Sequence, residues 1–381
     1  MPRGSPARIP TLDGIRAIAI ALVFVCHVLG TQHVPHGPRD IRYLLGDIGV
    51  RTFFILSGFL ITTLLAREYA KTRAISLRGF FVRRAFRIFP AFFTYLGVMA
   101  VLAGIGAIVL PAREIAWAAS YTMNFHTPET WWVGHLWSLA VEEQFYLIWP
   151  LTVVIVGLTR STRVALGAII AAPLLRAVAH VMLPELEDAG DHAFPFVFDA
   201  LAIGCVLALV RDQLERSPRY LAILHARVFW LLPIAALTAF TLSLGHPVPN
   251  AFAISFANVG IVMALHRCVL TPTGAVGRFL ELRPLVWVGT LSYSLYLWQQ
   301  PFLNRHTAEW FTAFPVNLVL SVALGCASYY LIERPVLRWR ARSAEQAKQR
   351  AEDAADVVHP VGLAEGDPRD PSLQLLRGRV K

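Results

Sequence analysis

The chain has 381 residues, of which 56% are hydrophobic and 16% are charged, and its formal net charge is +10. A soluble protein of this length needs more charge on its surface, so the composition excludes an ordinary water-soluble enzyme and indicates a membrane protein. The four cysteines stand alone without CxxC pairs, so neither a disulfide framework nor a metal site is expected.

Long apolar segments dominate the chain, and each is about the 20 residues that a helix needs to cross a bilayer. They predict an all-α bundle of about ten transmembrane helices within residues 1–340. The shorter apolar stretch 113–126 is expected to be re-entrant or interfacial. From Ala341 the chain turns polar and charged, so we expect a disordered cytoplasmic tail over 341–381. The expected spans are 14–31, 48–66, 86–110, 137–157, 163–183, 195–211, 228–245, 250–270, 285–304 and 315–332.

The positive charges predict how these spans are oriented. Of the 35 Lys and Arg residues, 28 lie in, or at the edge of, segments that ten spans place on the same side as both termini. Because Lys and Arg are enriched in cytoplasmic loops, both termini are expected in the cytoplasm. The opposite side holds four basic residues (Arg39, Arg42, Arg113 and Arg305) and an acidic loop (Glu185, Glu187, Asp188 and Asp191).

Two ionisable residues lie in the first span. Arg16 and His27 are eleven positions apart, close to three helical turns, so both project from one face, about 16 Å apart along the axis. We expect Arg16 near the cytoplasmic surface and His27 in the outer half of the membrane. Taken alone, Arg16 suits an interfacial anchor and His27 suits a packing residue.

The fourth span carries two adjacent carboxylates, Glu142 and Glu143. This span enters from outside, so both are expected in the outer half of the membrane, at the level of His27. They diverge by about 100° on the helix, so at most one faces a given partner squarely. A carboxylate beside His27 would orient its ring and increase its basicity, as a general base requires. The alternative is a polar clamp between helices; catalysis is favoured because ionisable groups are costly inside a membrane.

Other polar residues fall at two levels. Asp199, Gln299 and Gln300 are expected near the outer level, and Ser57 precedes Gly58, which allows close backbone approach or a helix irregularity. On the cytoplasmic side, four arginines between aromatic residues suit phosphate recognition, with a simple charge anchor as the alternative. These arginines are Arg78, Arg83, Arg84 and Arg87. This layering suits an enzyme that takes a phosphorylated donor from the cytoplasm for an external acceptor, or an anion transporter.

Seven motifs, in order, resemble the acyltransferase 3 family of bacterial integral-membrane O-acyltransferases. They span nearly the whole hydrophobic part of the chain, and the first, second and fourth are highly specific. The motifs are LDGIRAIAIALVFVCHV (12–28), GVRTFFILSGFLIT (49–62), VRRAFRIFPAFF (82–93), HLWSLAVEEQFYLIWP (135–150), FDALAIG (198–204), LSYSLYLWQQPF (291–302) and IERPV (332–336).

The resemblance implies transfer of an acyl group, usually acetyl, from cytoplasmic acyl-CoA in the cell membrane of a bacterium. The acceptor would be a hydroxyl of an extracytoplasmic glycan, a lipid-linked saccharide or a glycosylated small molecule. No permanently bound cofactor, metal or nucleic-acid partner is implied. The family's Arg and essential His, with ten residues between them, match Arg16 and His27. This chain departs from many members at Gln299, where they have His, and at Val197, where they have Arg.

These residues together suggest a mechanism. His27, assisted by Glu142 or Glu143, would deprotonate the acceptor hydroxyl as it attacks the acyl thioester. A covalent acyl relay is an open alternative. Four arginines would hold the CoA phosphates or guide the pantetheine arm: Arg16, Arg83, Arg84 and Arg87. Four residues would bind substrate or support the site: Asp13, Ser57 (as a donor near the thioester oxygen), Asp199 and Gln299.

The competing class is a multi-pass transporter or flippase that uses the buried His and Glu for proton coupling. It would move its substrate without consuming a CoA thioester. A purely structural membrane scaffold does not explain why His27, Glu142 and Glu143 are expected at one depth.

Overall fold

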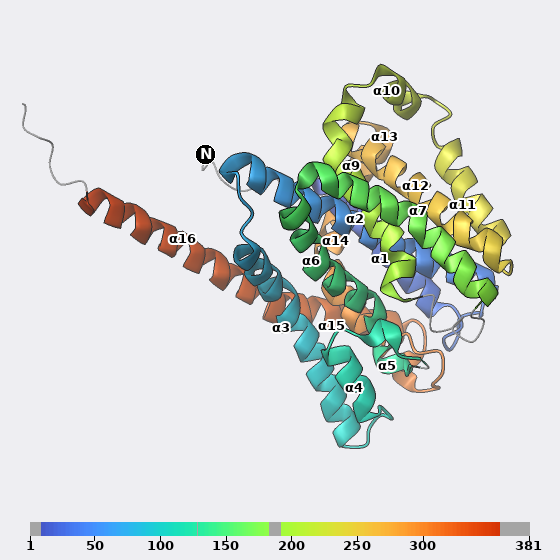
Figure 1. Ribbon diagram of the computed structural model, residues 1–381. Coiled ribbons are helices and arrows are strands. Elements are labelled where there is room, and N and C mark those ends of the chain that lie inside the picture. The colour runs from blue at the N-terminus through green and yellow to red at the C-terminus, as the bar shows by residue number, and fades with distance from the viewer. Residues whose placement is uncertain (1–8, 128, 183–191, 359–381) are drawn as a thin grey trace, which may run out of the picture. The chain divides into compact units, whose positions relative to one another are not determined.

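The computed structural model describes residues 9–127, 129–182 and 192–358, which are helical without any named β-strand (Figure 1). The predicted all-α bundle is therefore confirmed. The chain forms two compact units, residues 1–333 and 334–381. Each predicted span coincides with a helix: α1 (Pro10–Val28), α2 (Arg39–Thr72), α3 (Leu77–Gly104), α6 (Leu136–Val156), α7 (Leu158–Met182), α9 (Phe194–Glu215), α11 (Leu231–Ser243), α12 (Pro247–Leu270), α14 (Arg283–Gln299) and α15 (Val316–Ser328).

Within the described residues, eight helical segments are long and apolar enough to cross a membrane. Of the ten helices above, α11, α14 and α15 have only 13, 17 and 13 residues, and α15 is among the eight because its helical segment continues to Ala347. In contrast, α2 has 34 residues and extends beyond the predicted span 48–66 at both ends. A hydropathy pattern marks where a helix meets lipid, but backbone hydrogen bonding continues into polar segments, so the pattern misses the helix ends.

Short helices connect the long ones. The stretch 113–126 forms α4 (Ala112–Ala119) and a 3-10 turn, η1 (Met123–Phe125), which agrees with its prediction as too short to span. Helix α4 lies beside α3 (Figure 1). The acidic loop at 185–191 lies outside the described residues. The other short elements are α5 (Trp131–Gly134), α10 (Pro218–His225), α13 (Ala275–Leu280), η3 (Trp310–Thr312) and the π-helical η4 (Tyr329–Glu333).

The second unit differs from its prediction. Residues 341–358, expected to be disordered, belong to helix α16 (Arg334–Val358), and residues 359–381 lie outside the described residues. The physical reason is that this segment is rich in Ala, Glu, Gln, Lys and Arg, which are the strongest helix formers. Its low hydrophobicity predicts the absence of a packed core, which is a different property from the absence of a helix.

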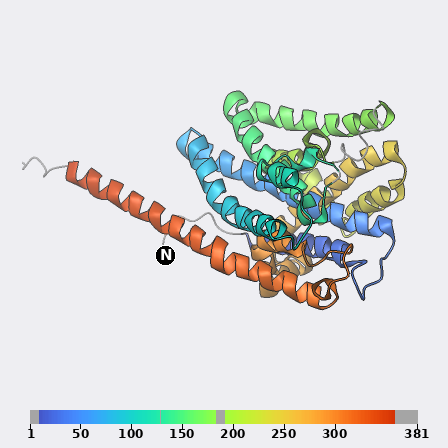
Figure 2. The ribbon, with the colours of Figure 1, turned by 90° about the horizontal axis from the view of Figure 1, so that it is seen from below.

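Helix α2 runs through the bundle and packs against α1, α6, α9, α11 and α12 (Figures 1 and 2). Its contact with α9 is close because each helix has a glycine at the crossing. A Cβ atom on Gly58 would lie 2.0 Å from the Leu201 carbonyl oxygen, and one on Gly204 would lie 2.2 Å from the Ile55 carbonyl oxygen. The close approach predicted at Gly58 is therefore confirmed, and it is the packing that small residues allow in membrane helices.

We expect Gly204→Ala to push α2 and α9 apart, because the new methyl group meets backbone that cannot rotate away. The expected loss is about 2 kcal/mol of stability, measured as a lower thermal midpoint in detergent. Gly97→Ala is the matched control, since no atom lies within 4 Å of a Cβ at Gly97. That variant should be neutral or more stable, because Ala favours helix over Gly. Equal midpoints for the two variants would contradict a tight crossing.

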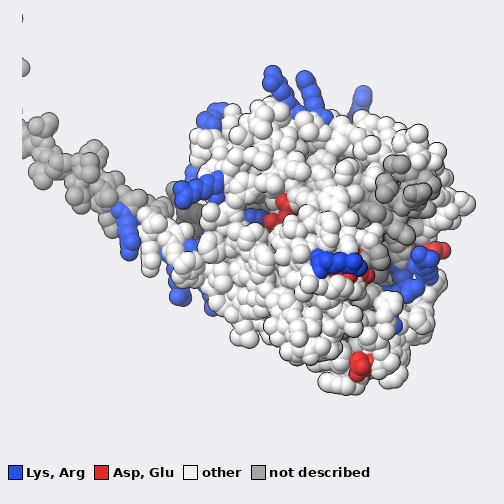
Figure 3. All heavy atoms as spheres, turned by 60° about the horizontal axis from the view of Figure 1, so that its bottom comes forward, with Lys and Arg blue, Asp and Glu red and all other residues white. Residues whose placement is uncertain are grey.

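The outward faces of the first unit are apolar. Large hydrophobic side chains are exposed on several helices, for example Ile155 on α6 (78%), Ile170 on α7 (64%) and Leu242 on α11 (75%). Most of the face shown in Figure 3 carries neither basic nor acidic side chains. A soluble protein does not expose such extensive apolar surface, so lipid is the solvent of these faces.

Candidate active site

Two cavities in the first unit contain the candidate residues. The smaller, called the arginine cavity, has a volume of about 100 Å³ and is lined by Arg16, Ser57, Arg84, Arg87, Glu142, Glu143 and Tyr146, among others. The larger, called the histidine cavity, has a volume of about 730 Å³ and is lined by His27, Trp131, His135, His192 and His306, among others. Val50 and Tyr296 line both, so the cavities adjoin at these two side chains.

Helix α1 lines both cavities. Arg16 lines the arginine cavity and His27 lines the histidine cavity, in agreement with their separation along the helix. Arg16 donates from Nη1 to Asp13 Oδ1 at 2.9 Å, so Asp13 supports the site by orienting Arg16.

Glu142 is bound within the arginine cavity. Ser57 Oγ donates to Glu142 Oε1 at 2.5 Å, and the Tyr146 hydroxyl donates to Ser57 Oγ at 3.1 Å. The Arg84 guanidinium lies 3.7 Å from the centre of the Tyr146 ring, in cation–π geometry. Glu142 thus shares this cavity with three arginines. Ser57 supports it and is a donor in this cavity.

The predicted pairing of His27 with Glu142 or Glu143 does not occur in the structure. Both glutamates line the arginine cavity, whereas His27 lies in the other. The prediction placed these residues at one depth from hydropathy alone, and depth does not determine which side chains converge. Glu143 Oε1 is buried and has no hydrogen-bond partner among the described residues.

The partner of His27 is Gln299, at the end of α14. Gln299 Oε1 lies 2.7 Å from His27 Nδ1, and Gln299 Nε2 donates to Gln300 Oε1 at 3.1 Å. Because the Gln299 amide nitrogen is engaged elsewhere, its oxygen faces the ring, so Nδ1 of a neutral imidazole carries the proton. Nε2 is then the lone-pair nitrogen. His27 is thus oriented as a base by the amide of Gln299, and not by a carboxylate.

Aromatic rings surround this histidine. The His27 and Trp131 ring centres are 5.4 Å apart, edge to face, and Trp131 Nε1 donates to the Gln300 carbonyl at 2.7 Å. Arg305 donates to the Cys26 carbonyl at 2.8 Å, and its guanidinium lies 5.2 Å from the Trp131 ring centre. These contacts fix the end of α1 against the loop after α14.

Two of the predicted arginines lie outside both cavities. Arg83 is half exposed and pairs with Glu68 at 3.1 Å, outside the arginine cavity. Arg78 also lines neither cavity. Of the arginines that the sequence predicted to bind phosphate, Arg16, Arg84 and Arg87 line the arginine cavity.

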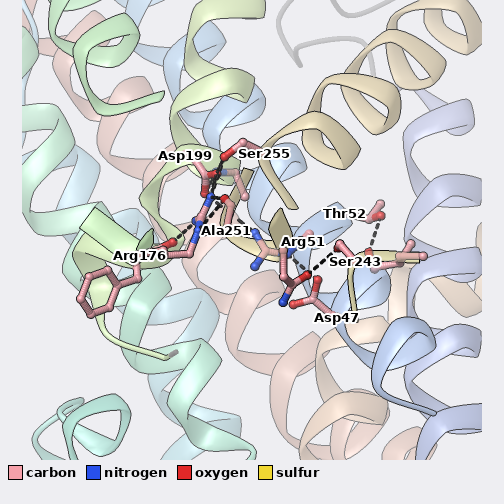
Figure 4. Close-up of polar contacts among 12 residues, drawn as sticks. Asp47, Arg51, Thr52, Arg176, Asp199, Ser243, Ala251 and Ser255 are labelled. Carbon is pink, nitrogen blue, oxygen red and sulfur yellow. Dashed lines mark hydrogen bonds and ion pairs between the residues drawn. The ribbon is translucent and has the colours of Figure 1, made fainter. Parts of the chain in front are cut away.

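Asp199, predicted as a supporting residue, belongs to a buried ion network (Figure 4). Its Oδ2 accepts from Arg176 Nη2 at 2.9 Å and from Ser255 Oγ at 2.6 Å, and Arg51 Nη1 lies 3.8 Å from its Oδ1. Arg51 also donates to Asp47 Oδ2 at 2.5 Å. Arg176 further donates to the Ala251 and Phe196 carbonyls. Asp47, Arg51 and Arg176 line the histidine cavity, so the network is one wall of it.

Sequence reasoning assigned no role in the site to Asp47, Arg51, His135, Arg176 or Tyr296. The signal was present, because an ionisable side chain within an apolar span is costly and requires a partner. The partners come from α2, α7 and α9, which are far apart in the sequence. The pairing therefore appears only in the fold.

Burial also changes titration at the rim of the histidine cavity. Burial raises the pKa of Glu129 above its usual range. Burial lowers the pKa of His192 to about 4, and the Arg51 charge lowers it further. His192 is thus neutral near pH 7, and its ring stacks on Trp137 with centres 3.9 Å apart.

The cavities lie within an apolar helix bundle, as in a multi-pass membrane enzyme or transporter. Residues 9–332 match the family model described as an acyltransferase domain. The chain belongs to the acyltransferase 3 family and has the helices of a multi-pass membrane protein.

Similar proteins include bacterial O-acetyltransferases. The chain is 32% identical over 364 residues to "Putative peptidoglycan O-acetyltransferase YrhL" of Bacillus subtilis, covering 86% of this chain and 55% of that one. It is 27% identical over 371 residues to O-acetyltransferase OatA of Staphylococcus aureus (87% and 58%). It is 29% identical over 334 residues to peptidoglycan O-acetyltransferase OatA of Listeria monocytogenes (80% and 51%). The chain thus spans about half the length of these relatives. No solved structure matches it.

Proposed function

We propose that this chain transfers an acetyl group from acetyl-CoA to a hydroxyl of an extracytoplasmic saccharide, with a peptidoglycan glycan strand as the first candidate. The observation that carries the proposal is the adjacency of a cavity with three arginines to one with an oriented histidine, meeting at Val50 and Tyr296. The names of the relatives support acetyl as the group and peptidoglycan as the acceptor.

The arginine cavity suits the donor. Arg16, Arg84 and Arg87 carry permanent charge, and guanidinium groups bind phosphate with bidentate geometry. The excess of Lys and Arg on the side of both termini supports a cytoplasmic location of these termini in the bacterial cell membrane. In this orientation the arginine cavity faces the cytoplasmic supply of acetyl-CoA, and the histidine cavity faces outward.

The histidine cavity suits the acceptor. Its volume, its tryptophans and its polar side chains are those of a small-molecule site with few orienting groups. His27 Nε2 takes the proton of the acceptor hydroxyl, and the hydroxyl oxygen attacks the thioester carbonyl. The carbon–sulfur bond breaks, and the CoA thiolate leaves and takes up the proton that His27 accepted, which restores the neutral imidazole.

The test uses membranes that contain the full chain, acetyl-CoA labelled in the acetyl group, and soluble peptidoglycan fragments. We expect equal amounts of released CoA and of base-labile acetyl ester on the glycan, both absent from membranes without the chain. Release of CoA with free acetate as the product would overturn the proposed acceptor. Movement of the glycan across vesicles without thioester consumption would favour the transporter alternative.

A further inference from the structure

His135 is a buried histidine that the mechanism above does not use. It directly precedes α6, is 5% exposed and lines the histidine cavity with His27. Neither of its ring nitrogens has a hydrogen-bond partner within the part of the chain that the structure describes. The Leu297 backbone contributes an electrostatic interaction, without hydrogen-bond geometry.

The surrounding residues hold this imidazole without engaging its nitrogens. The ring centres of Tyr95 and Tyr296 each lie 5.4 Å from that of His135. The two hydroxyl groups are occupied with backbone, since Tyr95 donates to the Trp132 carbonyl at 2.6 Å and Tyr296 donates to the His135 carbonyl at 2.8 Å. The ring is therefore packed in place with its polar edge unsatisfied. A buried polar group of this kind destabilises a fold, so it needs an explanation outside packing.

Two more buried polar atoms in the same cavity lack a hydrogen-bond partner among the described residues. They are Arg51 Nη1 and Thr307 Oγ1. A neutral imidazole offers one donor and one acceptor, a guanidinium offers donors, and a hydroxyl offers both. A ligand with several hydroxyl or carbonyl oxygens, as a saccharide has, complements this set.

We propose that His135 is an acceptor-binding residue, an inference that rests on the proposed function. It hydrogen-bonds a hydroxyl of the saccharide that does not react, and this contact directs the reacting hydroxyl toward His27. Arg51 Nη1 and Thr307 Oγ1 bind further oxygens of the same saccharide. His135 takes no proton in the reaction and acts by positioning.

The experiment compares His135→Phe, which removes both nitrogens and keeps a ring, with His135→Gln, which retains a donor and an acceptor. Initial rates are measured in membranes with acetyl-CoA and soluble peptidoglycan fragments. We expect the KM for the fragments to rise about tenfold in His135→Phe, with partial recovery in His135→Gln. The KM for acetyl-CoA should stay at the wild-type value. The thermal midpoint of His135→Phe should equal or exceed that of the wild type, because an unpaired buried group is lost.

His126→Phe is the matched control. His126 also has a buried Nε2 without a hydrogen-bond partner among the described residues, stacks on Trp117 with ring centres 5.6 Å apart, and lines neither cavity. Its KM for the fragments should not change. A wild-type KM in His135→Phe, or a KM change that only accompanies a lowered thermal midpoint in both His135 variants, would overturn this inference alone. A wild-type chain that acetylates no saccharide would instead overturn the proposed function and this inference with it.

Discussion

Replacing His27 with Ala is expected to lower the rate of acetyl transfer by about 10²–10⁴-fold, the usual contribution of a general base. The reason is that Nε2 of His27 is the lone-pair nitrogen of a ring oriented by Gln299, at the wall of the larger cavity. The measurement is the initial rate of glycan acetylation in membranes, with the amount of inserted protein determined by immunoblot. The KM for acetyl-CoA should change little, because His27 lies outside the arginine cavity.

Gln299→Leu tests the orientation of His27 separately. The variant keeps the base and removes the hydrogen bond to Nδ1, so we expect a smaller loss of acetylation rate, about tenfold, without loss of acetyl-CoA binding.

Glu142→Gln tests the pairing that the sequence predicted. If Glu142 assisted His27 directly, this variant would behave as His27→Ala does. The structure predicts instead a change in KM for acetyl-CoA, since Glu142 lies among the arginines. Full activity of His27→Ala would refute the mechanism.

Replacing Arg87 with Met is expected to raise the KM for acetyl-CoA by about 10–100-fold, the range for losing a hydrogen bond to a charged group. Arg87 lines the arginine cavity, and Met preserves much of its apolar stem. The measurement is the rate of acetylation against acetyl-CoA concentration. The effect should shrink at high ionic strength, because salt weakens the wild-type interaction as well.

Arg83→Met is the matched control for Arg87→Met. Arg83 lies on the same helix, carries the same charge and pairs with Glu68 outside the cavity. If the basic residues act only as a positive-inside anchor, the two variants should behave alike. If the cavity binds the donor phosphates, only Arg87→Met should raise the KM.

Several features of this protein follow from the sequence alone. The composition and the ten apolar segments predicted an all-α membrane bundle, because hydropathy measures the transfer of a helix into lipid without reference to its neighbours. The spacing of Arg16 and His27 predicted that both side chains project from one helix face at two different depths in the membrane. In the structure these residues line two adjoining cavities. The motifs predicted the family, which the match over residues 9–332 confirms.

The partners of each polar residue were decided only by the tertiary structure. Gln299 binds His27 across 272 positions of sequence, and Glu142 binds Ser57 across 85. The glycine crossing of α2 and α9 brings Arg51 to the Asp199 and Arg176 pair. Hydropathy predicts how deep a residue lies in the membrane, and helical periodicity predicts which residues share a helix face. Neither predicts how a helix is rotated in the bundle or which helix lies next to it. Those depend on side-chain packing between helices, so the sequence predicted which residues are costly to bury and the fold determined how each is satisfied.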